Sequence, residues 1–435
     1  MIRFAFQILM RVQLARNHYL FRTVVQLQLF GNLRVMVSSK AAFIYLLGLV
    51  VVSTSCRTVD SDTGHWYKGN LHTHSYWSDG DDYPEMIMDW YQSHGYQFVA
   101  LSEHNIIADH EKWVRIGQDS LKKVALNNYR GRFGDDWVVD QLDENGLAIK
   151  LKTLEEYRPI FEEPGKFLII QSEEITNQIG DKPLHLNATN LRNLIEPQQG
   201  ESVVEILQKS IDAVQQQREE TDQPMIIHLN HPNFHYAVSL EDMIALRGEQ
   251  FFEVFNGHPQ VHNQGDSVHI GTEEMWDLVN IAYLRQGKPM LYALGTDDSH
   301  NYHRMGRQWS NSGRGWVMVY ANELTPEAII EALEAGAFYA STGVTFAKLE
   351  TEEGAIRIEV AAEPGVHYHI QFIGCRQGGD HSEVFEEVDG VSGAYTLQPD
   401  QLFVRAKVLS DKQHPNPIEQ LDMEMAWTQP VTHSH

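Results

Sequence analysis

The sequence predicts an α/β protein in which a barrel of alternating strands and helices precedes a small all-β region. Two observations predict the barrel: short apolar runs recur between residues 69 and 300, and segments with helical periodicity separate several of them. A third observation places the boundary, because from about residue 347 the chain consists of strands that alternate apolar and polar residues. We therefore expect an N-terminal extension and linker over 1–64, a barrel over 65–346 and a β-sandwich-like domain over 347–435.

The first of these parts resembles a bacterial lipoprotein signal. Lys40 is followed by AAFIYLLGLVVVSTSC, an apolar run that ends in small residues before Cys56. In such signals the cysteine is lipidated and becomes the new N-terminus. Met36 is a natural start, which leaves residues 1–35 as an upstream extension. The alternative is an uncleaved membrane anchor, for which the run is short. We expect an exported protein, periplasmic or at the cell surface of a bacterium, attached to the membrane through Cys56.

Seven apolar runs predict the strands of the barrel, in chain order. They are GNLHTH (69–74), YQFVALSEH (96–104), GKFLIIQSEE (165–174), PLHLNATNL (183–191), PMIIHLNHP (224–232), FFEVFNG (251–257) and MLYALGTDDSH (290–300). Amphipathic segments over 83–95, 201–217, 272–287 and 325–336 predict helices between or after them. The first of these segments has Pro84 near its first turn and Gly95 at its end, which are signals of a helix start and stop.

Two further regions complete the expected architecture. Residues 105–165 form a polar, partly helical insertion whose aromatic residues either build a local core or wall the pocket. In the C-terminal region, GAIRIEVAA (354–362), VHYHIQFIG (366–374) and QLFVRAKVL (401–409) show the alternation of half-buried antiparallel strands. This region could act as a lid over the barrel mouth or could serve packing alone.

Composition excludes some classes of function. The formal net charge is -25, which argues against a nucleic-acid scaffold and an anionic membrane surface because both partners are polyanions. A phosphorylated substrate is still compatible with this charge, since bound metal reverses the local field. The two cysteines, Cys56 and Cys375, lie far apart in the sequence and imply no disulfide framework.

Side chains typical of metal ligands stand at the end of every predicted strand. In strand order they are His72, His74 and Asp79; Glu103 and His104; Glu173 and Glu174; His185; His228 and His231; Asn256 and His258; and Asp297, Asp298 and His300. In a β/α barrel the C-terminal ends of the strands converge on one mouth, where catalytic groups collect. We therefore expect these side chains to meet in one metal site.

Strand geometry supports this prediction at single positions. Side chains alternate along a strand, so His72 and His74 share one face, and Asp298 and His300 repeat that spacing. Imidazole and carboxylate ligands without thiolate suit zinc, manganese or iron. The ligands exceed what one tetrahedral ion needs, which predicts two or three ions bridged by a carboxylate such as Glu174. Of His228 and His231, three residues apart, we expect one ligand, and Pro232 favours His231 at the rim.

These residues also carry a resemblance to a known family. LHTHSYWSDG, VALSEHN, SEEIT, LHLNA, NHPN and GTDDSH resemble the motifs of the PHP (polymerase and histidinol phosphatase) metallohydrolases over roughly residues 65–345. EVFNG and the terminal AWTQP are similar to its carbaryl-hydrolase-like branch. The resemblance implies a distorted seven-stranded (β/α)7 TIM-like barrel with up to three ions.

The resemblance also implies three sets of ligands. One ion would be held by His72, His74, Glu174 and Asp298, a second by Glu174, His185 and His231, and a third by Asp79, His104 and His300.

The chain departs from the family pattern in three places. Glu103 stands where an aspartate is usual, and Gln171-Ser172-Glu173 replaces a glycine, which leaves Glu173 and Glu174 as alternatives. GTDDSH is one residue longer than the common motif, which leaves Asp297 and Asp298 as alternatives. The shared face with His300 favours Asp298.

The sequence contains no sign of a protein nucleophile: there is no GxSxG elbow, no P-loop and no thiol near the cluster. We therefore expect a metal-bridged hydroxide to attack a small ester, with phosphomono- or phosphodiesters as the leading substrates. His104, His300 or His258 could donate the leaving-group proton. The alternatives are a carbamate, amide or carboxylic-ester hydrolase with the same ions, and a non-catalytic surface-anchored binding lipoprotein.

Overall fold

The computed structural model of the protein describes residues 64–248, 250–352 and 354–433. The expected signal and Cys56 lie outside the described residues. No helix within these ranges combines the length and the apolar character that a membrane crossing needs.

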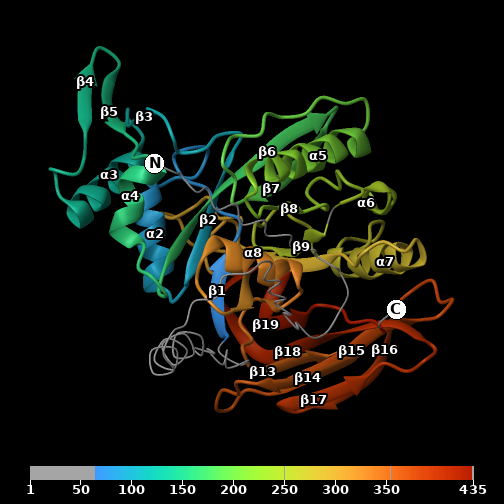
Figure 1. Ribbon diagram of the computed structural model, residues 1–435. Coiled ribbons are helices and arrows are strands. Elements are labelled where there is room, and N and C mark those ends of the chain that lie inside the picture. Colours follow the sequence, from blue (N-terminus) through green and yellow to red (C-terminus); the bar gives the residue numbers. More distant parts are fainter. Residues whose placement is uncertain (1–63, 249, 353, 434–435) are drawn as a thin grey trace, which may run out of the picture. The chain divides into compact units, whose positions relative to one another are not determined.

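A strand lies at each of the seven predicted runs, although β1 covers only the first two residues of the run 69–74, and all seven belong to one 13-stranded sheet (Figure 1). They are β1 (His65–Asn70), β2 (Phe98–His104), β6 (Leu168–Ile179), β7 (Lys182–Thr189), β8 (Ile226–Leu229), β9 (Phe251–Asn256) and β10 (Tyr292–Thr296). Across the sheet they follow the order β10-β9-β8-β7-β6-β2-β1. The order along the sheet is therefore the order along the chain, as in a repeated β-α protein.

The closed (β/α)7 barrel is not what the described strands form. β7 is antiparallel to both β6 and β8, because only Gly180 and Asp181 separate it from β6 and a parallel pair needs a connection of a dozen residues or more. The hydrogen-bonded order ends at β10 on one side and continues past β1 on the other. The described part of the chain is thus a mixed α/β structure around a large open sheet.

The sheet nevertheless curls enough to bring the segments beyond β1 and β10 together. An isolated parallel bridge joins Thr73 to Ser299. The His74 N–H donates to the Ser299 carbonyl at 3.0 Å, and the Asp298 N–H donates to the His72 carbonyl at 3.0 Å. These bonds place the HxH and DxH segments side by side.

Five helices accompany the sheet strands: α2 (Pro84–Ser93), α5 (Val203–Thr221), α6 (Leu240–Ala245), α7 (Thr272–Arg285) and α8 (Pro326–Glu334). α5 shows why they form, since the Ser202 side chain caps the helix by accepting the Glu205 N–H. Its apolar stripe, including Leu207 and Ile211, is buried in a cluster with Leu186 and other residues of β7–β9. Each such side chain contributes roughly 1.5–3 kcal/mol on burial, so the packing holds the strands that carry the ligands.

The predicted insertion folds as a small subdomain beside α2. It contains α3 (Ser120–Phe133), α4 (Leu154–Phe161) and a three-stranded sheet of β3 (Trp113–Arg115), β4 (Asp140–Asp143) and β5 (Gly146–Lys150). Tyr129 and Tyr157 are buried in its local core, and Tyr129 stacks on Tyr83 with ring centroids 4.1 Å apart. Its aromatic residues therefore serve packing rather than the pocket.

Six of the nine strands after β10 extend the same sheet. The nine strands are β11 (Trp316–Ala321), β12 (Phe338–Ser341), β13 (Phe346–Glu352), β14 (Ala355–Val360), β15 (Tyr368–Arg376), β16 (Glu383–Asp389), β17 (Ser392–Thr396), β18 (Gln401–Ile418) and β19 (Leu421–Thr428). β12 pairs with β19, so the large sheet contains strands from both sides of residue 346, after which a separate sandwich was expected to begin. β13, β14 and β17 form their own three-stranded sheet, and the two sheets share an apolar core.

The predicted sandwich is not confirmed as a separate domain, because the described residues all belong to one compact unit. A buried ion pair also links the C-terminal strands to α7. Arg405 on β18 donates to Asp277 on α7 at 2.7 and 2.8 Å and lies 3.0 Å from Glu273.

Candidate metal centre

The structure brings the nine predicted ligands together, although Glu174 and His185 lie within β6 and β7 and not at strand ends. Seven of them line one pocket of about 310 Å³: Asp79, His104, Glu174, His185, His231, Asp298 and His300. His72 and His74 lie fully buried behind this pocket and contact Glu174 and Asp298. The side chains come from three strands, β2, β6 and β7, and from the segments that follow β1, β8 and β10, so only the folded sheet assembles them.

Four donor-to-donor distances in the first group are close to those found around a divalent metal ion. His72 Nε2 lies 3.4 Å from Glu174 Oε2 and 3.2 Å from Asp298 Oδ1. His74 Nε2 lies 3.2 and 3.3 Å from the same two oxygens. Around an ion with ligands at about 2.0–2.2 Å, neighbouring donor atoms lie about 3.3–3.6 Å apart. The four donors therefore fit one divalent ion between them.

The second group shares the other oxygen of Glu174. Glu174 Oε1 lies 2.9 Å from His185 Nδ1 and 3.6 Å from His231 Nε2. His231 Nε2 also lies 3.9 Å from Asp298 Oδ2. Each carboxylate thus turns one oxygen to the first group and one to the second, which is the arrangement of a bridging ligand.

The third group gathers around Asp79 at the mouth of the pocket. Asp79 Oδ1 lies 3.3 Å from His300 Nε2, and Oδ2 lies 3.5 Å from His104 Nε2. His74 Nδ1 lies 3.8 Å from Asp79 Oδ1. The Asp79 side chain is 57% exposed, so this group opens to solvent while the first is buried.

Several atoms that would bind a metal ion in these groups are buried and make no hydrogen bond. They are His72 Nε2, His74 Nε2, Glu174 Oε2 and His185 Nδ1. Buried polar atoms in folded proteins almost always have a partner, and clustered exceptions call for an explanation. Divalent cations such as Zn²⁺, Mn²⁺ or Fe²⁺ would provide one, since all four atoms are nitrogen or oxygen donors suited to them.

The electrostatics of the centre agree with this explanation. Burial would raise the pKa of Glu174, but the imidazoles of His104, His185 and His72 hold it well below its usual value. Burial would lower the pKa of His104 and His300, but nearby carboxylates outweigh it and raise these values to about 11 and about 9. Protonated imidazoles therefore neutralise the carboxylates, and a divalent cation can take over that role.

The two ambiguous carboxylate pairs are separated by where their side chains point. Glu173 points away from the cluster and accepts the Ile195 N–H at 2.8 Å, and burial raises its pKa to about 8. Asp297 accepts hydrogen bonds from Asn70, Tyr91 and the backbone N–H groups of residues 313–315. Glu174 and Asp298 are the members of each pair that face the imidazoles.

His228 and Glu103 lie near the ligands without facing the pocket. The imidazole of His228 is fully buried and has Glu253 as its neighbour at 3.5 Å, away from Glu174. Glu103 accepts the Ser75 N–H at 3.0 Å and the Ser78 hydroxyl. It thereby fixes the loop that carries Asp79.

His258, the remaining predicted site residue, lines the pocket with Phe234 and Gln260. Its ring centroid lies 5.6 Å from that of His300 and 6.0 Å from that of Phe234. Burial lowers the pKa of His258 to about 4, so its imidazole is neutral near neutral pH.

Two ligand residues adopt strained backbone conformations. Asp298 has φ 48° and His231 has φ 20°, which L-residues rarely adopt. Such conformations persist where surrounding contacts enforce them, and they cluster at functional sites.

The sequence analysis missed the residues that hold the ligands from behind. Glu253 on β9 is fully buried and hydrogen-bonds His72, and Asn230 donates to Glu174 Oε1 at 2.8 Å. Glu253 could have been found, because a single charge inside the apolar run FFEVF predicts a buried partner.

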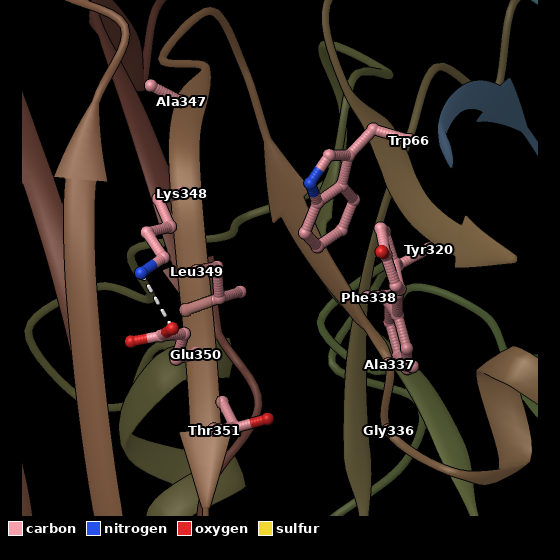
Figure 2. Close-up of a pocket in the computed structure, with 10 residues that line it drawn as sticks. All are labelled: Trp66, Tyr320, Gly336, Ala337, Phe338, Ala347, Lys348, Leu349, Glu350 and Thr351. Carbon is pink, nitrogen blue, oxygen red and sulfur yellow. Dashed lines mark ion pairs between the residues drawn. The ribbon is translucent and has the colours of Figure 1, made fainter. Parts of the chain in front are cut away.

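A second hollow of about 370 Å³ lies elsewhere, between β13 and the strands β1, β11 and β12. Figure 2 shows Trp66 and Tyr320 across this hollow from the Lys348–Glu350 ion pair, whose atoms are 2.7 Å apart. None of the predicted ligands lines it. The chemistry of the ligand cluster is therefore confined to the first pocket.

A scan against protein-family models and a search of curated proteins find no match to this chain. Among solved structures, one neighbour is a two-domain protein from Bacteroides vulgatus described as containing a predicted PHP-like metal-dependent phosphoesterase. It has 15% identity and a TM-score of 0.37, and the match covers 85% of this chain and 96% of that one. A candidate metal-dependent phosphoesterase from Bifidobacterium adolescentis has 12% identity and a TM-score of 0.28, with 53% and 87% covered.

The descriptions of these two neighbours name a PHP-like phosphoesterase and a phosphoesterase. A third neighbour, an amidohydrolase from Chromobacterium violaceum with bound sulfate, has 12% identity and a TM-score of 0.26, with 54% and 88% covered. None of these neighbours is described as a carbaryl hydrolase. At such low identities and TM-scores, the assignment of chemistry rests on the ligand geometry.

Proposed function

We propose that this protein is a metal-dependent hydrolase of the PHP type that cleaves small esters, with phosphomono- or phosphodiesters as its leading substrates. The observation that carries the proposal is the spacing of 3.2–3.4 Å between the imidazole nitrogens of His72 and His74 and the oxygens of Glu174 and Asp298. This spacing is that of donors around a divalent ion.

The nine ligands would hold two or three divalent ions, zinc, manganese or iron. Divalent ions in these groups would polarise the ester and lower the pKa of bound water toward about 7. Glu174 and Asp298 each serve two groups and fix the distance between them. Asp79 closes the third group from the solvent side.

The residues that line the pocket fit hydrolysis by water. They include no hydroxyl, thiol or amine side chain that could attack a substrate. A pocket of about 310 Å³ is at the lower end of small-molecule sites, which suits a small ester. Phe234 and Gln260 line the same pocket and would contact the substrate.

His258 is the proposed contact to the leaving group. His104 and His300 both lie against Asp79 and belong to the third ligand group. That leaves His258 as the candidate imidazole outside the groups. Because it is neutral near neutral pH, it would orient the leaving oxygen by a hydrogen bond rather than carry a charge.

One observation favours a second candidate reaction on the same ions. The ten residues that line the pocket include no lysine or arginine to pair with a charged phosphoryl group. A carbamate, amide or carboxylic ester would not need such a partner. A non-catalytic binding lipoprotein is the weaker proposal, because a disused site would have no reason to keep all nine ligands in contact. Export and attachment through Cys56 remain proposals that rest on the sequence.

Rates on aryl phosphates, bis-aryl phosphates and aryl carbamates would test this proposal, using the mature chain with added Mn²⁺ or Zn²⁺. We expect His72→Ala to abolish turnover and to lower the metal content. His367→Ala, at an 87% exposed histidine on the surface, is the matched control and should leave both unchanged. Turnover of phosphoesters by His72→Ala at the wild-type rate would refute the assignment, and faster carbamate than phosphate cleavage would favour the second candidate.

A further inference from the structure

Glu253 carries a carboxylate into the interior directly behind the metal centre. It lies on β9, where all six residues are buried and it is the one charged residue. Its Oε1 accepts the Thr296 hydroxyl at 2.8 Å and pairs with His72 Nδ1 at 2.6 Å. Its Oε2 accepts the His231 N–H at 2.9 Å and the Asn256 amide at 2.8 Å. Both oxygens of this carboxylate are therefore fully engaged.

The contact with His72 decides which nitrogen of that ring faces the ions. With Nδ1–H donating to Glu253, the lone pair of Nε2 points between Glu174 and Asp298. A carboxylate on the far nitrogen of a ligating imidazole fixes the tautomer and ring orientation and makes the ligand more basic.

The contact with His231 acts on a second ligand. His231 has φ 20°, a strained value, and its N–H is held by Glu253. This bond offsets part of the cost of a conformation that brings Nε2 to within 3.6 Å of Glu174 Oε1.

Asn256 extends the arrangement to a third ligand. Its amide nitrogen lies 2.8 Å from Glu253 Oε2 and 3.0 Å from Asp298 Oδ2. Asp298 is the second strained ligand, with φ 48°. One buried carboxylate thus connects His72, His231 and Asp298, which come from three different strand ends.

We propose that Glu253 is the positioning residue of this metal centre, holding His72 and His231 directly and Asp298 through Asn256 in the geometry that binds the ions. The inference rests on the metal-binding part of the proposed function. It adds a residue that belongs to none of the three ligand groups described above and whose loss would weaken metal binding without removing any of the nine ligands.

Glu253→Gln is the test variant, because the amide keeps the size but turns one acceptor into a donor that opposes the donors around it. Glu173→Gln is the matched control, since Glu173 is another buried carboxylate and points away from the cluster. The readout is the affinity of the full mature chain for Mn²⁺ and Zn²⁺, measured by competition with a chromophoric chelator. We expect Glu253→Gln to weaken the affinity about 10- to 100-fold and Glu173→Gln to leave it unchanged.

A second readout follows the His72 ring itself. In ¹⁵N-histidine NMR spectra of the Zn²⁺-loaded protein, wild type should show an Nδ1–H proton shifted downfield by its short bond to the carboxylate, and Glu253→Gln should lose that signal. A carboxylate that only stabilised the fold would leave the ring tautomer as it is.

The outcomes separate this inference from the proposed function. Wild type that binds no ion would refute both. Wild-type binding with equal affinity in Glu253→Gln would overturn the positioning role alone and leave the hydrolase proposal standing. If Glu253→Gln does not fold, Thr296→Val decides instead: it removes one donor to Oε1 and should weaken affinity about tenfold, and an unchanged affinity would overturn the inference.

Discussion

Asp297→Asn should lower the stability of the fold, whereas Asp298→Asn should lower metal binding. Asp297 accepts the Asn70 amide at 2.7 Å and the Tyr91 hydroxyl at 2.8 Å. It also accepts the N–H groups of Gly313, Arg314 and Gly315 at 2.9, 2.6 and 2.9 Å. In Asp297→Asn, one oxygen can still serve residues 314 and 315, but an NH₂ group then faces the other three donors.

The size of the stability loss in Asp297→Asn follows from the number of hydrogen-bond donors left without an acceptor. The Tyr91 hydroxyl can turn toward Ser299 Oγ, which lies 3.1 Å away. Two N–H groups, one of the buried Asn70 amide and one of the half-buried Gly313, then lose their acceptor, and each costs about 1–3 kcal/mol. We therefore expect Asp297→Asn to lower the free energy of unfolding of the metal-free protein by about 2–6 kcal/mol.

Asp298→Asn should instead leave most of that stability and lose metal, because its carboxylate faces the imidazoles of the first two groups. Urea unfolding of the metal-free variants and elemental analysis of the loaded variants measure the two effects. A stable Asp297→Asn that fails to bind metal, beside an Asp298→Asn that binds it normally, would reverse the ligand assignment.

Three further predictions concern protons and a buried ion pair. The pKa of Glu173 is raised to about 8 from 4.5, so the unfolded chain loses this proton first and stability falls as pH rises between these values. In thermal unfolding, the stability of Glu173→Gln relative to wild type should therefore increase from about pH 5 to about pH 8. A stability difference between the two proteins that does not change with pH would contradict this. Arg405→Met leaves the carboxylates of α7 buried with fewer partners and should cost about 3 kcal/mol in urea unfolding, whereas Arg405→Lys, which keeps the charge, should cost less; equal costs would argue against the ion pair. His104 and His300 carry protons in the metal-free protein, with pKa values of about 11 and about 9, and metal ions must displace these protons to bind. The metal affinity should therefore rise between about pH 6 and about pH 8, by up to about tenfold for each pH unit and for each proton displaced. A metal titration that is the same at both pH values would show that these imidazoles do not ligate.

Much of the architecture could be predicted from apolar periodicity. A strand lies at each of the seven runs, in the expected order along the sheet, and each of the four predicted segments contains a helix, with α5 ending four residues beyond its segment. The parallel direction of β7 was wrong, although the two-residue connection Gly180-Asp181 is a hairpin signal that periodicity alone does not weigh. The separate sandwich is not confirmed, and the pairing of β12 with β19 joins residues 85 to 89 positions apart, about which local patterns carry no information.

The site shows the same division between local and distant information. The spacing of HxH and DxH predicted shared faces, and the structure places those side chains in contact. Neighbouring residues such as Asp297 and Asp298 could not be ranked with certainty from spacing, because the choice depends on a positive φ at Asp298 and on donors from residues 313–315. Glu253 escaped notice because its partners lie on three other segments of the chain.

Anomalous diffraction from crystals of the protein grown with Mn²⁺ or Zn²⁺ would test the central claim most directly. The account predicts a peak about 2.0–2.2 Å from His72 Nε2, His74 Nε2, Glu174 Oε2 and Asp298 Oδ1. A second peak should lie beside Glu174 Oε1, between His185 and His231. Ordered side chains in this arrangement with no anomalous peak among them would contradict the account.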